Sequence, residues 1–220
     1  MKETYLKLIN TLIFLAIAAT TLVISLFFLP TTSEFFEFNK FTAFLAITII
    51  GLILWAIKMI IDRRFTLTSC PINLPLLILV VVFFVATLTS VDQYYSISGS
   101  VGRLWPSLLT LATISAFFVL ICSNLKTRNQ VEIITWTLAG GVTLSSAVAI
   151  FSYFGFYLPF DFAQIRSFNP IGAINRLALL QAMVIPITLS WAVFSKSRQI
   201  MIAATTCTML MAASLVLVNH

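Results

Sequence analysis

Three arginines in two polar connections are the residues of this chain best suited to chemistry. Arg103 ends a stretch of hydroxyls, tyrosines and glycines that begins at Ser90, and Arg166 and Arg176 belong to the stretch 156–176. A guanidinium is a planar fork that can donate to two oxygens of one phosphate. The pattern therefore indicates a phosphate or diphosphate site, and contact with lipid headgroups is the alternative interpretation.

Other reactive groups are sparse. The cysteines Cys70, Cys122 and Cys207 form no CxxC pair, and the single histidine, His220, is the last residue. Since metal sites are built from closely spaced Cys, His and carboxylates, we expect neither a metal nor a cofactor. The carboxylates on the side of the arginines form no D-x-D motif; they are Glu34, Glu37, Asp92 and Asp161. Asp92 and Asp161 could each orient an arginine or act as a base, and a solvated loop charge is the alternative interpretation of both.

The composition indicates the environment of the segments that carry these residues. Hydrophobic residues make up 60% of the 220 residues, charged residues 9%, and the mean hydropathy is +1.06. Soluble domains have about 45–50% apolar and about 25% charged residues. We therefore predict an all-α polytopic membrane protein. The net charge of +6 is no sign of nucleic-acid binding, because no basic run is longer than Arg63-Arg64.

Seven apolar stretches are long enough to cross a bilayer, which takes about 20 residues as a helix. Because the stretches are continuous rather than alternating, they predict helices and not a barrel. The pattern predicts a single transmembrane domain, 1–220, in the form of a helical bundle. The predicted spans are Ile9–Pro30, Phe41–Ile61, Leu74–Val91, Leu104–Cys122, Val131–Gly155, Arg176–Phe194 and Ile200–Val218.

The basic residues predict the orientation of these spans. Nine of the thirteen fall on one side of the predicted membrane, and the other four are Lys40, Arg103, Arg166 and Arg176. The positive-inside rule then places the N-terminus in the cytoplasm. The first apolar run is about 20 residues, longer than the 7–15 of a signal peptide, so we interpret it as a retained span.

The predicted membrane interior carries almost no ionisable group, which argues against a proton relay or an ion pathway. Lys58 lies one turn from the cytoplasmic end of its span, where its side chain can snorkel. Ala139, Thr143 and Ala147 form a small-residue stripe that favours close helix packing. The connection 156–176 is too apolar for a solvated loop, so we expect it to lie in the interface or fold back onto the protein.

Several short motifs occur in an order that resembles a known family. Phe38-Asn39-Lys40 opens the second span, Pro71-Ile-Asn-Leu-Pro-Leu-Leu leads into the third, and Ile185-Pro186 lies in the sixth. The two most telling stretches are Ser90-Val-Asp-Gln-Tyr-Tyr-Ser-Ile-Ser-Gly-Ser-Val-Gly-Arg103 and Ser167-Phe-Asn-Pro-Ile-Gly-Ala-Ile-Asn-Arg-Leu-Ala178. Together they resemble the amino-terminal half of the O-antigen ligase and polymerase family of multi-pass bacterial glycan transferases.

The resemblance implies a function in cell-envelope polysaccharide and lipopolysaccharide biosynthesis. Family members move a glycan from an undecaprenyl-diphosphate carrier to a glycan acceptor on the outer face of the bacterial cytoplasmic (inner) membrane, without a metal. Arginines bind the diphosphate, which at matching positions implies Arg103, Asn175 and Arg176, with Arg166 and Asp92 as weaker candidates. The family's large outer loop and its histidine have no counterpart here, and His220 is not given that role. We therefore expect a truncated fragment that is inactive alone.

Two further functions stay open at this point. A transporter or flippase fragment would show paired repeats and polar groups at mid-membrane, which the sequence does not show. A membrane subunit without chemistry is the third alternative. In each case membrane lipids are expected partners and nucleic acid is not.

Overall fold

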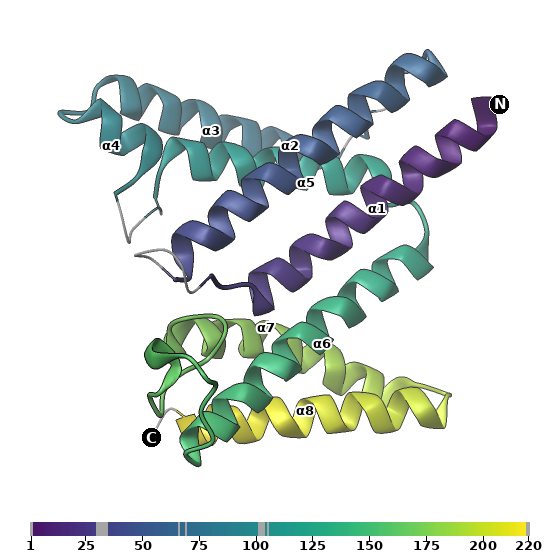
Figure 1. The fold of residues 1–220 in the computed structure, drawn as a ribbon. Helices are drawn as coiled ribbons and strands as arrows, with labels where there is room; N and C mark the ends of the chain where they lie inside the picture. The colour runs from purple at the N-terminus through teal and green to yellow at the C-terminus, as the bar shows by residue number, and fades with distance from the viewer. Residues whose placement is uncertain are drawn as a thin grey trace. The chain divides into compact units, whose positions relative to one another are not determined.

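The computed structural model describes residues 2–29, 35–65, 67–68, 70–100, 104 and 106–218. Over these residues the chain is 78% helix and contains no strand, which confirms the predicted all-α class (Figure 1). Five helices are long and apolar enough to cross a membrane: α1 (Lys2–Leu26), α2 (Glu37–Asp62), α6 (Arg128–Tyr153), α7 (Ile174–Phe194) and α8 (Arg198–Val218). The predicted multi-pass character is therefore supported by length and composition.

The third and fourth predicted spans correspond to shorter helices, α3 (Asn73–Leu88) and α5 (Leu108–Asn124). For α5 the reason is the residue that caps its start. Ser107 caps α5 by accepting the backbone N–H of Thr110 at 3.2 Å, so the helix begins at Leu108 and not at Leu104. The chain between them forms the short helix α4 (Gln93–Ser98). At 16 and 17 residues, α3 and α5 lie at the lower limit of span length.

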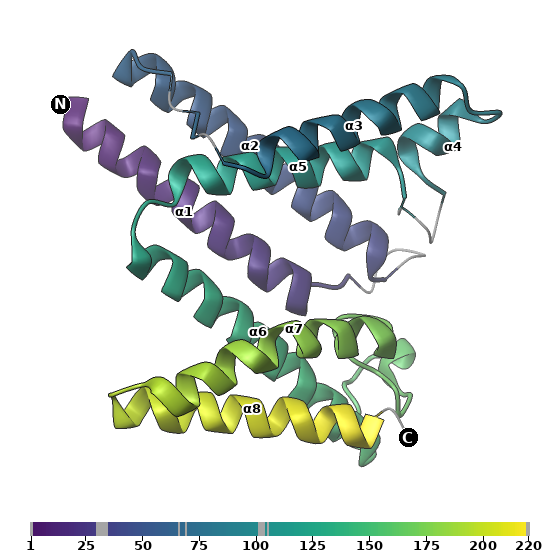
Figure 2. The same ribbon diagram turned by 180° about the vertical axis from the view of Figure 1, so that it is seen from behind.

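Contacts group the chain into two units. The first unit contains residues 1–20 and 40–132, and the second contains 21–39 and 133–220. In the first unit α3 packs along α5, and α4 contacts both helices (Figure 2). The core includes Ile13 and Ile17 of α1 and Leu120 of α5, all nearly inaccessible to solvent. Gly51 of α2 faces Leu120, and a Cβ at Gly51 would lie 2.6 Å from Leu120 Cδ2.

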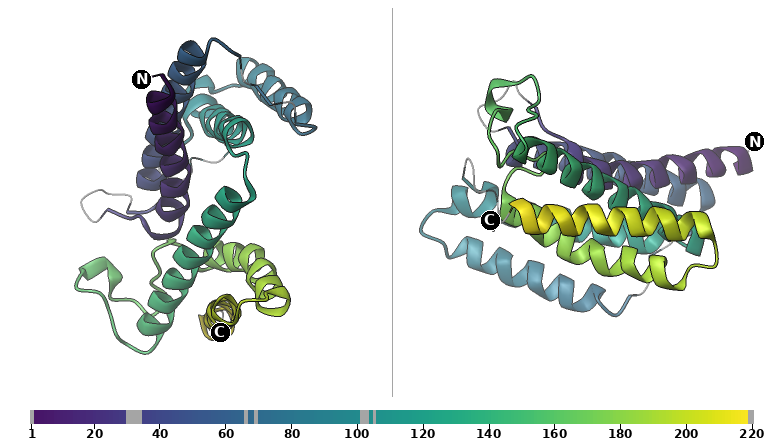
Figure 3. Two further views of the ribbon diagram at one scale, coloured as in Figure 1. Left: turned by 90° about the vertical axis from the view of Figure 1, so that its right-hand side faces the viewer. Right: turned by 90° about the horizontal axis from the view of Figure 1, so that it is seen from below.

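The second unit is organised around α7 and α8, which lie side by side and are joined by a tight connection (Figure 3). Ala139 and Val142 of α6 pack with Val184 of α7 and Met211 of α8 in a fully buried cluster. The rings of Trp136 and Trp191 stack with centroids 4.4 Å apart. Helix α7 runs from Ile174 to Phe194 with Pro186 in its interior.

Apolar side chains also cover much of the outside of the described helices. On α3, nine large hydrophobic residues are exposed, including Leu77, Val81 and Phe84. A helix that is apolar on all sides belongs in a membrane or in a larger core. These outward-facing residues are therefore consistent with helices that contact lipid.

Candidate functional site

The apolar connection predicted to fold back onto the protein does so within the second unit. Phe160, Phe162 and Phe168 pack against Phe28, Phe35 and Phe36, with ring centroids from 4.5 to 6.5 Å apart. We call these six residues the phenylalanine cluster. Aromatic pairs at such separations stabilise beyond the area they bury. The cluster thus fixes the connection 154–173 to the segment between α1 and α2, and the prediction is confirmed.

A turn at the end of this connection sets the start of α7. The side chain of Asn169 is fully buried; its Oδ1 accepts the backbone N–H of Gly172 at 2.9 Å and its Nδ2 donates to the Ser167 carbonyl at 3.2 Å. Gly172 has a φ of +112°, and a Cβ there would lie 3.0 Å from the ring of Phe36. Two features therefore favour glycine at this position: the positive φ, and the Phe36 ring that leaves little room for a Cβ.

Arg176 lies in the first turn of α7 and pairs with Glu37 in the first turn of α2. Its Nη2 donates to Glu37 Oε2 at 2.5 Å, and the side chains are 50% and 19% exposed. The ion pair ties the two helix starts together across 139 residues of sequence. Because a guanidinium has five N–H donors and half of this side chain is open to solvent, Arg176 keeps donors for a second anion.

Arg166 is exposed on the connection before α7, and Asn175 is exposed beside Arg176 in the first turn of α7. Arg166 forms no ion pair with any residue that the structure describes. A hollow of about 400 Å³ is lined by Phe35, Pro159, Phe160, Asp161 and Phe162. The connection and the start of α7 therefore carry two exposed guanidinium groups and an amide, and the connection also lines an aromatic hollow with one carboxylate.

The other two predicted site residues belong to the first unit. Asp92 is the N-cap of α4, where its Oδ1 accepts the backbone N–H of Tyr95 at 3.2 Å. This contact gives the carboxylate a role in holding the helix start. Arg103 lies outside the described residues, as do Glu34 and His220. A diphosphate-binding role for Asp92 and Arg103 stays a prediction.

Sequence reasoning missed a set of polar contacts inside the second unit. Gln181 of α7 is only 1% exposed, and its Nε2 donates to Ser146 Oγ of α6 at 2.8 Å. Ser145 Oγ donates to the Ser25 carbonyl of α1 at 2.5 Å, and Thr208 of α8 donates to Thr188 of α7 at 2.8 Å. The available signal was the recurrence of Ser, Thr and Gln within apolar spans, where such side chains join helices.

The predicted small-residue stripe on α6 is part of the same packing. Ala139 and Thr143 are buried, which confirms close packing at these two positions, whereas Ala147 is only partly buried. The closest approach is at Gly141, which faces Ser25.

Among the described residues, no group of three or more His, Cys, Asp or Glu side chains could hold a metal ion. No protein family, curated protein or solved structure matches this chain. The assignment of a function therefore depends on the residues themselves and on the motif order of the sequence.

Proposed function

We propose that this chain binds a polyprenyl-diphosphate-linked glycan at the outer face of the bacterial cytoplasmic membrane, as part of glycan transfer of the O-antigen ligase type. The observation that carries the proposal is the pair of exposed guanidinium groups, Arg166 and Arg176, on a connection held by the phenylalanine cluster. An undecaprenyl-diphosphate carrier has an anionic head at the membrane surface and an apolar tail, and a glycan acceptor would approach from the same side.

The site chemistry follows from the charge of the ligand. Guanidinium forks neutralise the diphosphate oxygens, and the diphosphate becomes a better leaving group when its developing charge is stabilised by fixed donors. Asn175 adds an amide donor at the same helix turn. The positive end of the α7 dipole favours an anion at this place as well.

The proposal includes the topology with seven spans and a cytoplasmic N-terminus. The distribution of nine against four basic residues supports it, and so do the five span-length helices. Helices α3 and α5 rise only about 24–26 Å at 1.5 Å per residue, and local bilayer thinning can accommodate such short spans. Reporter fusions after Arg64, Arg128 and Arg198 should report cytoplasm, whereas fusions within 161–175 should report the outside.

The test is the affinity of the protein in nanodiscs for a polyprenyl-diphosphate analogue. Replacing Arg166 or Arg176 with Ala should weaken binding by about 1.5–3 kcal/mol, the range for hydrogen bonds to charged groups. Arg176→Lys should restore binding only in part, because an ammonium lacks the fork. Arg198→Ala, at the start of α8 on the other predicted side, is the control for loss of one positive charge.

Glu37→Gln separates ligand binding from the structural ion pair. This variant loses the Arg176–Glu37 pair but keeps the guanidinium, so its affinity should equal or exceed that of the wild type. If Arg176 only joins two helices, Glu37→Gln and Arg176→Ala should behave alike. Equal affinities in the wild type and in both arginine variants would contradict the proposal.

A further inference from the structure

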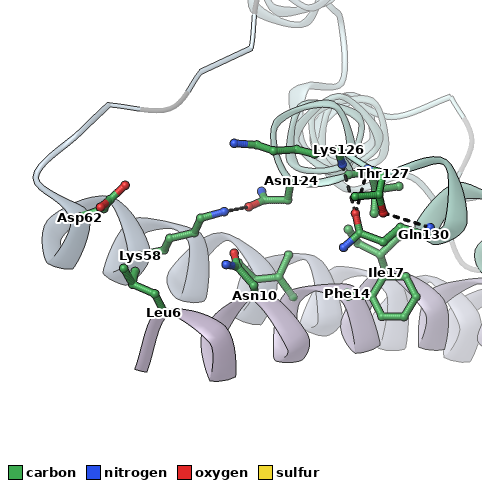
Figure 4. A pocket seen from close by; sticks show the side chains of 12 residues that line it. Leu6, Asn10, Phe14, Ile17, Lys58, Asp62, Asn124, Lys126, Thr127 and Gln130 are labelled. Atoms are coloured by element: carbon green, nitrogen blue, oxygen red, sulfur yellow. Dashed lines mark hydrogen bonds between the residues drawn. The ribbon is translucent and has the colours of Figure 1, made fainter. Parts of the chain in front are cut away.

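A second polar site lies in the first unit, on elements that the proposed function does not use. It is a cavity of about 300 Å³ where the N-terminal half of α1 meets the last turns of α2 and α5 and the start of α6. Figure 4 shows Lys58, Asp62, Asn124 and Lys126 around it, with Asn10 reaching in from α1. We call it the lysine pocket.

Lys58 is the most deeply placed charge of the pocket. The residue is 8% exposed, and its Nζ donates to Asn124 Oδ1 at 2.8 Å (Figure 4). Within the described chain no carboxylate lies at ion-pair distance from this ammonium. An ammonium has three donors, and here one of them meets a neutral carbonyl, while Asp62 attracts the charge from beyond ion-pair distance. The buried ammonium thus keeps donors for which no described residue is the acceptor.

The remaining charges of the pocket leave it positive. Asp62 is engaged by Lys2 of α1, with Lys2 Nζ 3.8 Å from Asp62 Oδ1. Lys126 is exposed at the pocket rim and forms no ion pair with a described residue. The pocket lining therefore carries the two ammonium groups of Lys58 and Lys126 against the one carboxylate of Asp62, and Lys2 adds a further positive charge beside that carboxylate.

Two backbone donors just before α6 are already engaged. Gln130 Oε1 accepts the backbone N–H groups of Lys126 and Thr127 at 3.1 and 3.2 Å. The positive character of the pocket therefore comes from the two ammonium groups.

The other walls of the pocket are apolar. Leu6 and Phe14 of α1, which are partly exposed, line it together with Ile13 and Ile17, whose side chains are almost fully buried. Helices α1 and α2 are both of span length. A free ion would need no such surface, whereas a lipid places a phosphate beside hydrocarbon. Basic pockets between membrane helices bind anionic lipid headgroups. The cavity volume is at the lower end of the range for ligand sites, which suits a phosphate and its ester rather than a large head.

We propose that the lysine pocket binds the phosphate of an anionic membrane phospholipid, with Lys58 and Lys126 as its charged donors and the partly exposed Leu6 and Phe14 of α1 against the first part of the acyl chains. The residues of the lysine pocket all belong to the first unit, whereas Arg166 and Arg176 belong to the second, so the two proposals use no residue in common.

The test is native mass spectrometry of the full chain, with retention of phosphatidylglycerol compared with phosphatidylcholine. The wild type should retain phosphatidylglycerol selectively. Lys58→Met should weaken that binding about tenfold or more, the factor for losing one hydrogen bond to a charged group. Lys126→Met should weaken it in the same direction, and because Lys126 is exposed, its loss leaves the fold intact. Lys196→Met, in the connection between α7 and α8, removes the same charge elsewhere and should bind as the wild type does.

Three results would overturn the proposal. Unchanged affinity in both pocket variants would show that the ammonium groups do not hold the lipid. An equal loss in Lys196→Met would show that only net charge matters. Inorganic phosphate or glycerol 3-phosphate that displaces the lipid at equal concentration would assign the pocket to a soluble phosphate instead. Loss of diphosphate binding in the arginine variants leaves this result unaffected, so the two proposals fail separately.

Discussion

The two units use cross-helix polar contacts in different ways. In the second unit the pairs Ser25–Ser145, Ser146–Gln181 and Thr188–Thr208 are neutral and buried or partly buried within packed helices. In the first unit Lys58 and Asn124 form a charged contact that borders a cavity. A satisfied neutral pair stabilises a helix bundle, whereas a buried cation with free donors beside a cavity is suited to a ligand. The difference indicates that buried polar pairs hold the packed helices of the second unit, whose proposed diphosphate site lies outside them, whereas in the first unit the polar contact itself borders a pocket.

The largest effect should come from separating Lys58 from its acceptor. Asn124→Leu leaves the buried ammonium without its carbonyl, and we expect it to lower the free energy of unfolding by about 1.5–3 kcal/mol. Lys58→Met removes the charge itself, and replacement of a buried charge by an apolar side chain is often neutral or stabilising. Unfolding in mixed micelles measures both variants.

The double variant Lys58→Met/Asn124→Leu is the control for this pair, and it should recover the stability lost in Asn124→Leu. If Lys58→Met is as destabilising as Asn124→Leu, the contact is structural, as in the second unit. The contrast between the two units would then not hold.

The sequence predicted the helices and the folded-back connection because both follow from local composition. Continuous apolar runs specify helices in a membrane, and a run of Phe, Leu and Ile in a connection must be covered. The Ser107 cap that shortens α5 was also readable in the sequence but was outweighed by hydropathy. The Lys58–Asn124 and Gln181–Ser146 contacts were not predictable, since they join residues 66 and 35 positions apart and depend on helix rotation.

The second prediction concerns how closely the helices of the second unit are packed. A Cβ at Gly141 would overlap Ser25 Oγ and lie 3.0 Å from Ser25 Cβ, whereas a Cβ at Gly140 would have no neighbour within 4 Å. Gly140→Ala should gain about 0.5–1 kcal/mol from helix propensity. Gly141→Ala should be less stable than Gly140→Ala by about 1–3 kcal/mol, because overpacking forces the neighbours to shift.

Thermal unfolding of the two glycine variants in one detergent gives this difference directly. Since both substitutions add the same methyl group to the same helix, propensity cancels between them. Equal stabilities would mean that α1 and α6 do not approach closely at Ser25, and the interpretation of the second unit as closely packed would lose its main support.

The smallest effect should be the coupling between Ser146 and Gln181. A double-mutant cycle with Ser146→Ala and Gln181→Leu should give about 0.6 kcal/mol, and no more than about 1.7, the values for hydrogen bonds between membrane helices. The control cycle pairs Gln181→Leu with Thr206→Ala, because Thr206 donates to the Ile202 carbonyl of its own helix and should show no coupling. A Ser146–Gln181 coupling equal to that control would mean that this hydrogen bond does not stabilise the second unit. Close packing at Gly141 would then hold α6 in place without help from polar pairs, while the charge at Lys58 would still call for a ligand in the first unit.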